Sequence, residues 1–590
     1  MSIDIETYRL KAQEAIEYVF VKEYHNSLGI PMPIVKMLLP DDANYSTGQY
    51  YITIDKTWQI HLNFGKLPIS YHEFQNEVKV LTRHEIEHYM CCPFDVITHF
   101  RMLKRIRDVY YKHFSHLGIN IEYACGAISN QAADIIVDTK NYYRHSKETL
   151  KSEIDWIKIG ANISACPRHC KLMFLTKEAI WKEDLGINET DPEFLKIVHQ
   201  LADSFTKNGI EDKSSFLDKV EEYAEIFFKL YVEDQKNPQQ SSQQGSQQQS
   251  GQQGSQQQSG QQGPQQQNGQ QGSQQQSGQQ GSQQQSGQWG VGRPKDGDEH
   301  GNAFVFADPD KVKEAIEVLA EETSVEEFID LLAIAGIIGM SDKQKGVLWF
   351  NVQSANIIPI VEFSNTGNKS SYTYPSVWRI GDPIEELDLM LTYMTSPRLI
   401  PGMTTKKWEY VSNDDNGTES KQMDLLLVVD TSGSMGSAMK ESANMHQAVL
   451  ASYGILSYFE STKSKVAFIG FSDKIDAYVD WSDKYDDVRE RLLTNGHGGT
   501  KFPISRIKST LDVRSRDLVT VLITNGDLGN INESVSYFRD YLNDDNKLYI
   551  FLLGGSKSLH SYEPLKNIGA KIYNANNANE FCDMVLTDME

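Results

Sequence analysis

The chain has 590 residues, of which 39% are hydrophobic, and a formal net charge of −23. Its length exceeds what one hydrophobic core supports, and its hydrophobic content is sufficient for several folded domains. The acidity argues against a nucleic-acid binder, because phosphate contacts need a basic face, and it favours divalent cations and basic partners.

Two features predict a cytoplasmic protein that does not enter a membrane. The first residues, MSIDIETYRLK, lack the apolar core of a signal peptide. The longest apolar run, residues 331–340, is about half as long as a membrane span requires. Six cysteines are too few for a disulfide framework. Cys166 and Cys170 lack a second pair to complete a zinc site, so we expect free thiols.

Composition divides the chain into four segments and predicts a multidomain α/β protein. We expect a mostly helical α+β domain at 1–235, a disordered Gln/Ser/Gly linker at 236–288, an acidic helical and mixed connector at 289–420, and an α/β domain at 421–590. The linker repeats units such as SGQQGSQQQ and has no apolar residue to bury, so it cannot offset the entropy of becoming ordered.

The N-terminal domain begins with a helical pattern at residues 6–25. Strand-like runs follow at 50–54 and 58–64, and helical patterns then dominate. One helix is expected to start at the capping box that Ser70 opens and to end before Pro93.

The stretch LTRHEIEHYM within this helix contains an HExxH motif. His84 and His88 are one helical turn apart, on the face that continues the apolar stripe of Phe74 and Val78. Two imidazoles on consecutive turns suit zinc, and Glu85 beside them suits a general base for metal-activated water.

A catalytic zinc needs a third protein ligand, and the helical segment NQAADIIVD offers one. We predict Asp134 as this ligand and Asp138 as the group that orients another ligand. His99 and Glu122 are the alternatives. Another interpretation is that Asn130, Asp134 and Asp138 form a solvated helix face.

The motifs HEIEHYM and NQAADIIVD together resemble bacterial proteins with an N-terminal zincin-like metallopeptidase domain and a C-terminal von Willebrand A-like domain. The resemblance implies a zincin-like fold and peptidase activity on a protein substrate. Zincins of the glutamate-ligand type carry a longer side chain where this chain offers Asp134. Tyr142, Tyr143 and His145 are unranked candidates for stabilising an oxyanion.

After the linker, residues 307–340 predict two acidic helices. From residue 424 the pattern becomes regular, with apolar strands at 425–430, 465–471, 518–524 and 547–553 alternating with helical segments. Continuous apolar strands separated by helices predict a doubly wound parallel sheet.

Asp430, Ser432 and Ser434, in the stretch DTSGS, directly follow the first of these strands. A carboxylate and two hydroxyls at the carboxyl end of a parallel strand form an all-oxygen site that suits Mg²⁺. The alternative is a Ser/Gly turn after a buried strand.

The DTSGS stretch resembles the DxSxS metal-ion-dependent adhesion site (MIDAS) of von Willebrand A domains. This resemblance implies Thr500 as a further ligand. It also implies an aspartate after Thr524, where this chain has Asn525, so that either Asn525 contributes through water or Asp527 takes its place. Such a site docks a carboxylate of a partner.

The chain lacks a GxxxxGK[ST] phosphate-binding loop, so it carries no such ATPase motor of its own. Proteins that it resembles work with MoxR-type AAA+ ATPases, sometimes in bacterial stress or phage-defence gene sets, which implies such a partner. The leading hypothesis is a zinc peptidase with a Mg²⁺-dependent docking domain. The alternatives are a scaffold with a structural or vestigial zinc site and a metal hydrolase that acts on other substrates.

Overall fold

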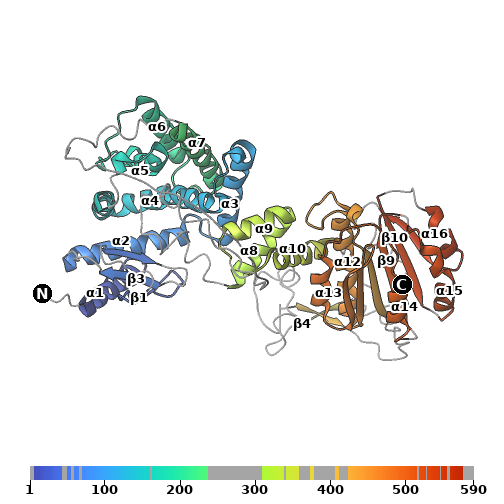
Figure 1. Ribbon diagram of the computed structural model, residues 1–590. Coiled ribbons are helices and arrows are strands. Elements are labelled where there is room, and N and C mark those ends of the chain that lie inside the picture. Colours follow the sequence, from blue (N-terminus) through green and yellow to red (C-terminus); the bar gives the residue numbers. More distant parts are fainter. Residues whose placement is uncertain are drawn as a thin grey trace, which may run out of the picture. The chain divides into compact units, whose positions relative to one another are not determined.

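In this computed structural model (Figure 1), the chain forms two compact units, Met1–Leu319 with Leu331–Ile337 and Ala320–Asp330 with Ile338–Glu590. The structure describes residues 5–42, 45, 50–54, 59–64, 70–159, 163–236, 309–337, 340–357, 372–377, 406–410, 423–514, 517–526, 528–544, 546–554 and 559–575. The predicted linker at 236–288 lies outside these residues, except for Lys236.

A small mixed sheet opens the N-terminal unit. Its strands are β1 (Ile34–Met37), β2 (Tyr50–Ile54) and β3 (Gln59–Phe64). The central strand β3 pairs parallel with β1 and antiparallel with β2. The two predicted strands are confirmed. Strand β1 was not predicted, because four residues are too few to show an alternating pattern.

Helices make up most of the unit. They are α1 (Ile5–Glu17), α2 (Tyr71–Met90), α3 (Val96–Val109), α4 (Ile121–Ile159), α5 (Arg168–Trp181), α6 (Pro192–Thr206) and α7 (Phe216–Lys236), with π-helical turns at Tyr18–Glu23 and Tyr110–Phe114. Helix α2 packs against α1, β2 and α4 (Figure 1). Helix α4 is kinked at His145, where the backbone leaves helical geometry.

The start of α2 follows the predicted capping chemistry. Ser70 is the N-cap, and its side chain accepts from the backbone N–H of Glu73. The Ser70 hydroxyl also donates to the Glu73 carboxylate at 2.9 Å. Phe74 and Val78 are fully buried. The capped end and the apolar stripe therefore fix which face of α2 points inward.

The two predicted acidic helices are present as α8 (Pro309–Glu322) and α9 (Val325–Ile334). Further along lie α10 (Asp342–Ile357) and an antiparallel pair, β4 (Tyr372–Val377) and β5 (Lys406–Tyr410). Helix α10 packs on α12 of the C-terminal sheet domain, and the ring centroids of Phe350 and Tyr453 are 5.5 Å apart.

A six-stranded sheet forms the core of the second unit. Its strands are β6 (Asp424–Asp430), β7 (Val466–Phe471), β8 (Ile475–Ser482), β9 (Leu518–Thr524), β10 (Lys547–Leu553) and β11 (Lys571–Ala575), in the order β11-β10-β9-β6-β7-β8. Five strands are parallel, as predicted, but the edge strand β8 runs antiparallel to β7. The four predicted strands are thus all parallel, and β8 is an additional edge strand that was not predicted. A half-exposed edge strand lacks the continuous apolar run that marks a central one.

Helices lie on both faces of this sheet. They are α12 (Asn444–Ser461), α13 (Tyr485–Leu492), α14 (Ile504–Leu511), α15 (Val535–Asn543) and α16 (Leu559–Lys566). Leu426 and Val428 of β6 share a core with residues of α14, α15 and α16, while α12 also packs on β6. The doubly wound arrangement is confirmed, and the carboxyl ends of the adjacent strands β6 and β9 meet at one edge.

Two further predictions concern the described residues. No helix among them has both the length and the apolar character to cross a membrane. Within the same part of the chain, the cysteines carry free thiols, as expected, at positions Cys91, Cys92, Cys125, Cys166 and Cys170.

Candidate metal centres

Three ligand-type atoms converge in the N-terminal unit. The Nε2 atoms of His84 and His88, both on α2, lie 3.0 Å apart. Asp134 of α4 places Oδ1 at 3.4 Å from the first of these nitrogens and 3.3 Å from the second. All three side chains are buried. The structure therefore brings together the predicted zinc ligands, and in the described part of the chain they form the only cluster of this kind.

The other nitrogen of each ring is held by an acceptor. His84 Nδ1 donates to Asp138 Oδ1 at 2.7 Å, and His88 Nδ1 donates to the carbonyl oxygen of Cys92 at 2.8 Å. With the proton on Nδ1, each neutral ring has its lone pair on Nε2. Both imidazoles are thus oriented with the ligating atom toward the cluster.

The spacing of the three atoms fits zinc. Tetrahedral zinc with bonds of about 2.0–2.1 Å places neighbouring ligand atoms about 3.3 Å apart. The three separations in the cluster, 3.0, 3.3 and 3.4 Å, lie close to this value. Two neutral imidazoles and one carboxylate are also the donor types that catalytic zinc sites use. Three protein ligands leave one position of the tetrahedron for water or substrate.

The carboxylates of α4 do not form a solvated face. Asp134 is 6% exposed and Asp138 is 7% exposed. Asn130 donates to Asp134 Oδ2 at 3.1 Å, so that Oδ1 is the oxygen turned to the histidines. The solvated-face interpretation is therefore wrong, because α2 packs over this side of α4.

A buried lysine completes the site. Lys177 of α5 donates to Asp138 Oδ2 at 2.5 Å and to Glu153 Oε1 at 2.9 Å. Burial alone would raise the pKa of Asp138, but the charges of Lys177 and His84 hold that pKa well below its usual range. Asp138 is therefore a carboxylate that bridges a lysine and a candidate metal ligand.

The sequence analysis missed Lys177, although a signal was present. Lys177 lies at helical spacing with Cys170, Phe174 and Trp181, which are buried and apolar. A lysine in an otherwise apolar stripe indicates a buried ion pair, because an unpaired ammonium is costly to bury.

Glu85 is buried beside the cluster, with 1% of its surface exposed. Burial disfavours the charged form of His88, but the hydrogen bond to Asp134 and the charge of Glu85 raise its pKa to about 9. The Glu85 carboxylate is thus buried within electrostatic range of a candidate ligand.

The alternative ligands do not join the cluster. His99 is buried on α3, and Glu122 is exposed in the first turn of α4. Among the described residues, neither shares the group that His84, His88 and Asp134 form.

The three oxyanion candidates have other surroundings. The Tyr142 hydroxyl donates to Glu183 at 2.8 Å, and Tyr143 is exposed. His145 lies at the kink of α4, with Nε2 at 4.0 Å from Glu23. These contacts do not assign a catalytic role to any of the three.

A second group of oxygen ligands lies at the carboxyl end of β6. Asp430 is fully buried, and its two oxygens accept from the Ser432 N–H at 2.9 Å and from the Thr524 hydroxyl at 2.6 Å. The hydroxyls of Ser432 and Ser434 are 3.1 Å apart. Octahedral Mg²⁺ with bonds of about 2.0–2.1 Å places adjacent ligands about 3 Å apart, so this pair fits the ion.

Asn525 clamps the DTSGS loop to the end of β9. Its Oδ1 accepts from the Ser434 hydroxyl at 3.1 Å, and its Nδ2 donates to the Ser434 carbonyl at 2.8 Å. The loop that carries Thr500 also reaches the site, since Gly433 N–H donates to the Gly498 carbonyl at 3.3 Å. Asp527 lies outside the described residues.

The C-terminal unit is an α/β region with helices on both faces of its sheet and a serine-rich loop at the carboxyl end of β6. No protein-family model and no curated protein matches the chain. Among solved structures, it is similar to the conserved hypothetical protein BatB from Bacteroides thetaiotaomicron, at 12% identity over 28% of this chain and 97% of that one, with a TM-score of 0.24.

The chain is also similar to a von Willebrand factor type A protein from Catenulispora acidiphila, at 9% identity over 29% of this chain and 42% of that one, with a TM-score of 0.22. Both likenesses are too weak to carry an argument about function. What can be concluded about the N-terminal unit therefore rests on the distances and burial of its own side chains.

Proposed function

We propose that the N-terminal unit is a zinc-dependent peptidase. The observation that carries this proposal is the convergence of His84 Nε2, His88 Nε2 and Asp134 Oδ1 within 3.4 Å of one another. The buried carboxylate of Glu85 follows the first of these residues on the same helix. Ligands without this carboxylate would suffice for a structural ion, whereas hydrolysis also needs a base.

Each residue has one task in this proposal. His84, His88 and Asp134 would hold the ion, which supplies a Lewis acid for the peptide carbonyl and lowers the pKa of water. Glu85 accepts the proton of the attacking water and returns it to the leaving amine. Asp138 keeps His84 in the tautomer that ligates through Nε2, and Lys177 keeps Asp138 charged.

The C-terminal unit, in the same proposal, docks a partner through Mg²⁺. The ion would be held by Asp430, Ser432, Ser434 and Thr500. A further contribution to binding the ion would come either from Asn525, through water, or from Asp527. A carboxylate of the partner would fill the remaining position. The resemblance of the two motif sets to known proteins supports a MoxR-type AAA+ ATPase as partner, in a cytoplasmic stress or phage-defence system.

The test compares the zinc-loaded full chain with Glu85→Gln on an unfolded protein substrate. The amide is isosteric with the carboxylate and cannot take the proton, so we expect hydrolysis to fall by about 10²–10⁴-fold with zinc content unchanged. Glu73→Gln, on the exposed start of the same helix, is the control and should keep its activity. Hydrolysis that survives in Glu85→Gln, or is absent from the wild type, would instead favour a scaffold.

A further inference from the structure

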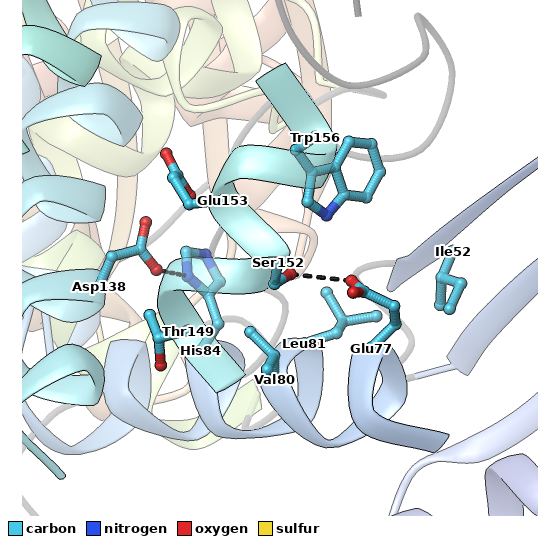
Figure 2. A pocket seen from close by; sticks show the side chains of 10 residues that line it. All are labelled: Ile52, Glu77, Val80, Leu81, His84, Asp138, Thr149, Ser152, Glu153 and Trp156. Atoms are coloured by element: carbon cyan, nitrogen blue, oxygen red, sulfur yellow. Dashed lines mark hydrogen bonds and ion pairs between the residues drawn. The ribbon is translucent and has the colours of Figure 1, made fainter. Parts of the chain in front are cut away.

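A small pocket adjoins the zinc-type cluster. It lies between α2, the second half of α4 and Ile52 of β2 (Figure 2). His84 lines the pocket and also belongs to the cluster. A group that enters the pocket is therefore next to a candidate metal ligand.

The lining of the pocket is acidic. Glu77, Asp138 and Glu153 contribute carboxylates, and no lysine or arginine belongs to the lining. Two of these carboxylates already have a cation as partner, because Lys177 forms salt bridges with Asp138 and Glu153. The third, Glu77, has no salt bridge among the described residues.

Glu77 has one hydrogen-bond donor in the described part of the chain. The Ser152 hydroxyl donates to its Oε2 at 2.8 Å, and Figure 2 shows the two side chains pointing toward each other. Burial raises the pKa of Glu77, with the Ser152 hydrogen bond opposing the rise. A cation beside this carboxylate would remove the cost of burying its charge.

The size of the pocket narrows the class of cation. Its volume is about 40 Å³, and one water needs about 10–15 Å³ on this measure, so about three non-hydrogen atoms fit. The end of a lysine side chain, the ammonium and two methylenes, has this size, whereas a guanidinium with its methylenes is larger. Val80, Leu81 and Trp156 give the methylenes an apolar wall.

We infer that this pocket is a specificity site for a lysine side chain of the peptide substrate, with Glu77 as the residue that binds the ammonium group. The inference rests on the proposed peptidase function and adds a substrate class to it. The lysine would lie at one fixed position relative to the bond that is cleaved. The acidity of the chain, with a net charge of −23, is compatible with a basic substrate.

The first experiment maps cleavage sites. The zinc-loaded full chain is incubated with a mixture of peptides, and the products are sequenced by mass spectrometry. We expect lysine at one position of the cleaved peptides, preferred over norleucine and arginine by at least about tenfold, as for a charge-assisted hydrogen bond. Glu77→Gln, which can still accept from Ser152, should reduce this preference to within about twofold while leaving zinc content unchanged.

Asp155→Asn is the matched control. Asp155 is on the same part of α4 and accepts from Lys151 at 2.7 Å, but it does not line the pocket. The substitution removes the same charge and should keep the lysine preference. An equal loss in Asp155→Asn and Glu77→Gln would overturn the inference, because the effect would then come from net charge alone.

A binding experiment separates this inference from the peptidase proposal. Lysine hydroxamate and norleucine hydroxamate share a zinc-binding group and differ in the ammonium, and their affinities are measured by calorimetry on zinc-loaded wild type and Glu77→Gln. Selective binding of the lysine compound by the wild type alone supports the pocket assignment, even if no peptide is hydrolysed. Equal binding of both compounds overturns it, even if peptides are hydrolysed.

Discussion

His84 Nε2 and His88 Nε2 lie 3.0 Å apart, and the Nδ1 atom of each ring donates to an acceptor. Two Nε2 atoms this close in a buried site need a cation between them, and the raised pKa of His88 agrees with this, because a protonated ring places a positive charge there. The hydrogen bonds on the far side of each ring thus prepare the pair for a metal ion.

Asp134→Ala should lose the metal. Two histidines alone hold zinc weakly, and loss of the carboxylate also removes the negative charge that offsets the ion. We expect the affinity for zinc to fall by more than about 100-fold, since even the partners that orient ligands contribute about 10–100-fold. Elemental analysis and zinc titration measure it. Asp155→Ala is the control, and full zinc retention in Asp134→Ala would exclude Asp134 as the third ligand.

Lys177→Met should destabilise the fold. Methionine fills a similar volume but leaves Asp138 and Glu153 buried without their cation, which costs about 3–5 kcal/mol of unfolding free energy. Denaturant unfolding of the full chain measures this change. Lys151→Met breaks the exposed pair with Asp155 and should cost less than about 1 kcal/mol. Similar losses in the two variants would show that the buried pair has no special role.

Asp430→Ala should remove Mg²⁺-dependent docking. Asp430 is the one carboxylate at the end of β6, so its loss should weaken the ion more than loss of either serine hydroxyl. Pull-down of a MoxR-type AAA+ ATPase, the proposed partner, with and without EDTA, measures docking. Asp480→Ala, on the exposed edge strand β8, serves as control. Equal recovery of the ATPase in every condition would exclude the DTSGS loop as the docking site.

Asn525→Asp should tighten Mg²⁺ binding. An aspartate keeps the acceptor for the Ser434 hydroxyl and loses the donor to the Ser434 carbonyl, but it adds a full charge beside the ion. Because the charge outweighs one neutral hydrogen bond, we expect the dissociation constant to fall by about tenfold. Calorimetric titration with Mg²⁺ measures it. Asn530→Asp is a matched control. The Asn530 amide also forms hydrogen bonds with backbone groups, the N–H and the carbonyl of Phe502, but away from the site. Unchanged affinity in Asn525→Asp would place Asn525 outside the site.

Much of the candidate zinc site could be read from local sequence. The capping box at Ser70 and the apolar stripe of Phe74 and Val78 determine which face of α2 is buried, and His84 and His88 lie on that face by helical spacing. The choice of Asp134 required a second helix. It succeeded in locating the cluster because the spacing of Asp134 and Asp138 puts both carboxylates on one side of α4.

The C-terminal sheet was predictable for the same local reason. Central parallel strands are buried on both faces, so β6, β7, β9 and β10 appear as continuous apolar runs. Strands β1, β8 and β11 are short or at sheet edges and lack this pattern, and they were missed. Their pairing depends on neighbours far along the chain, which no local window contains.

Only the tertiary structure shows which charged and amide side chains hold the candidate ligands of the two sites in place. Lys177 is 39 residues from Asp138, and Asn525 is 91 residues from Ser434. Helical or strand periodicity shows which side of a helix or strand is buried. It does not show which residues of another helix or strand pack against that side. The sequence by itself determined the ligand types and the faces that carry them. Packing of α5 against α4, and the pairing of β6 with β9, determined which charges and amides hold those ligands in place.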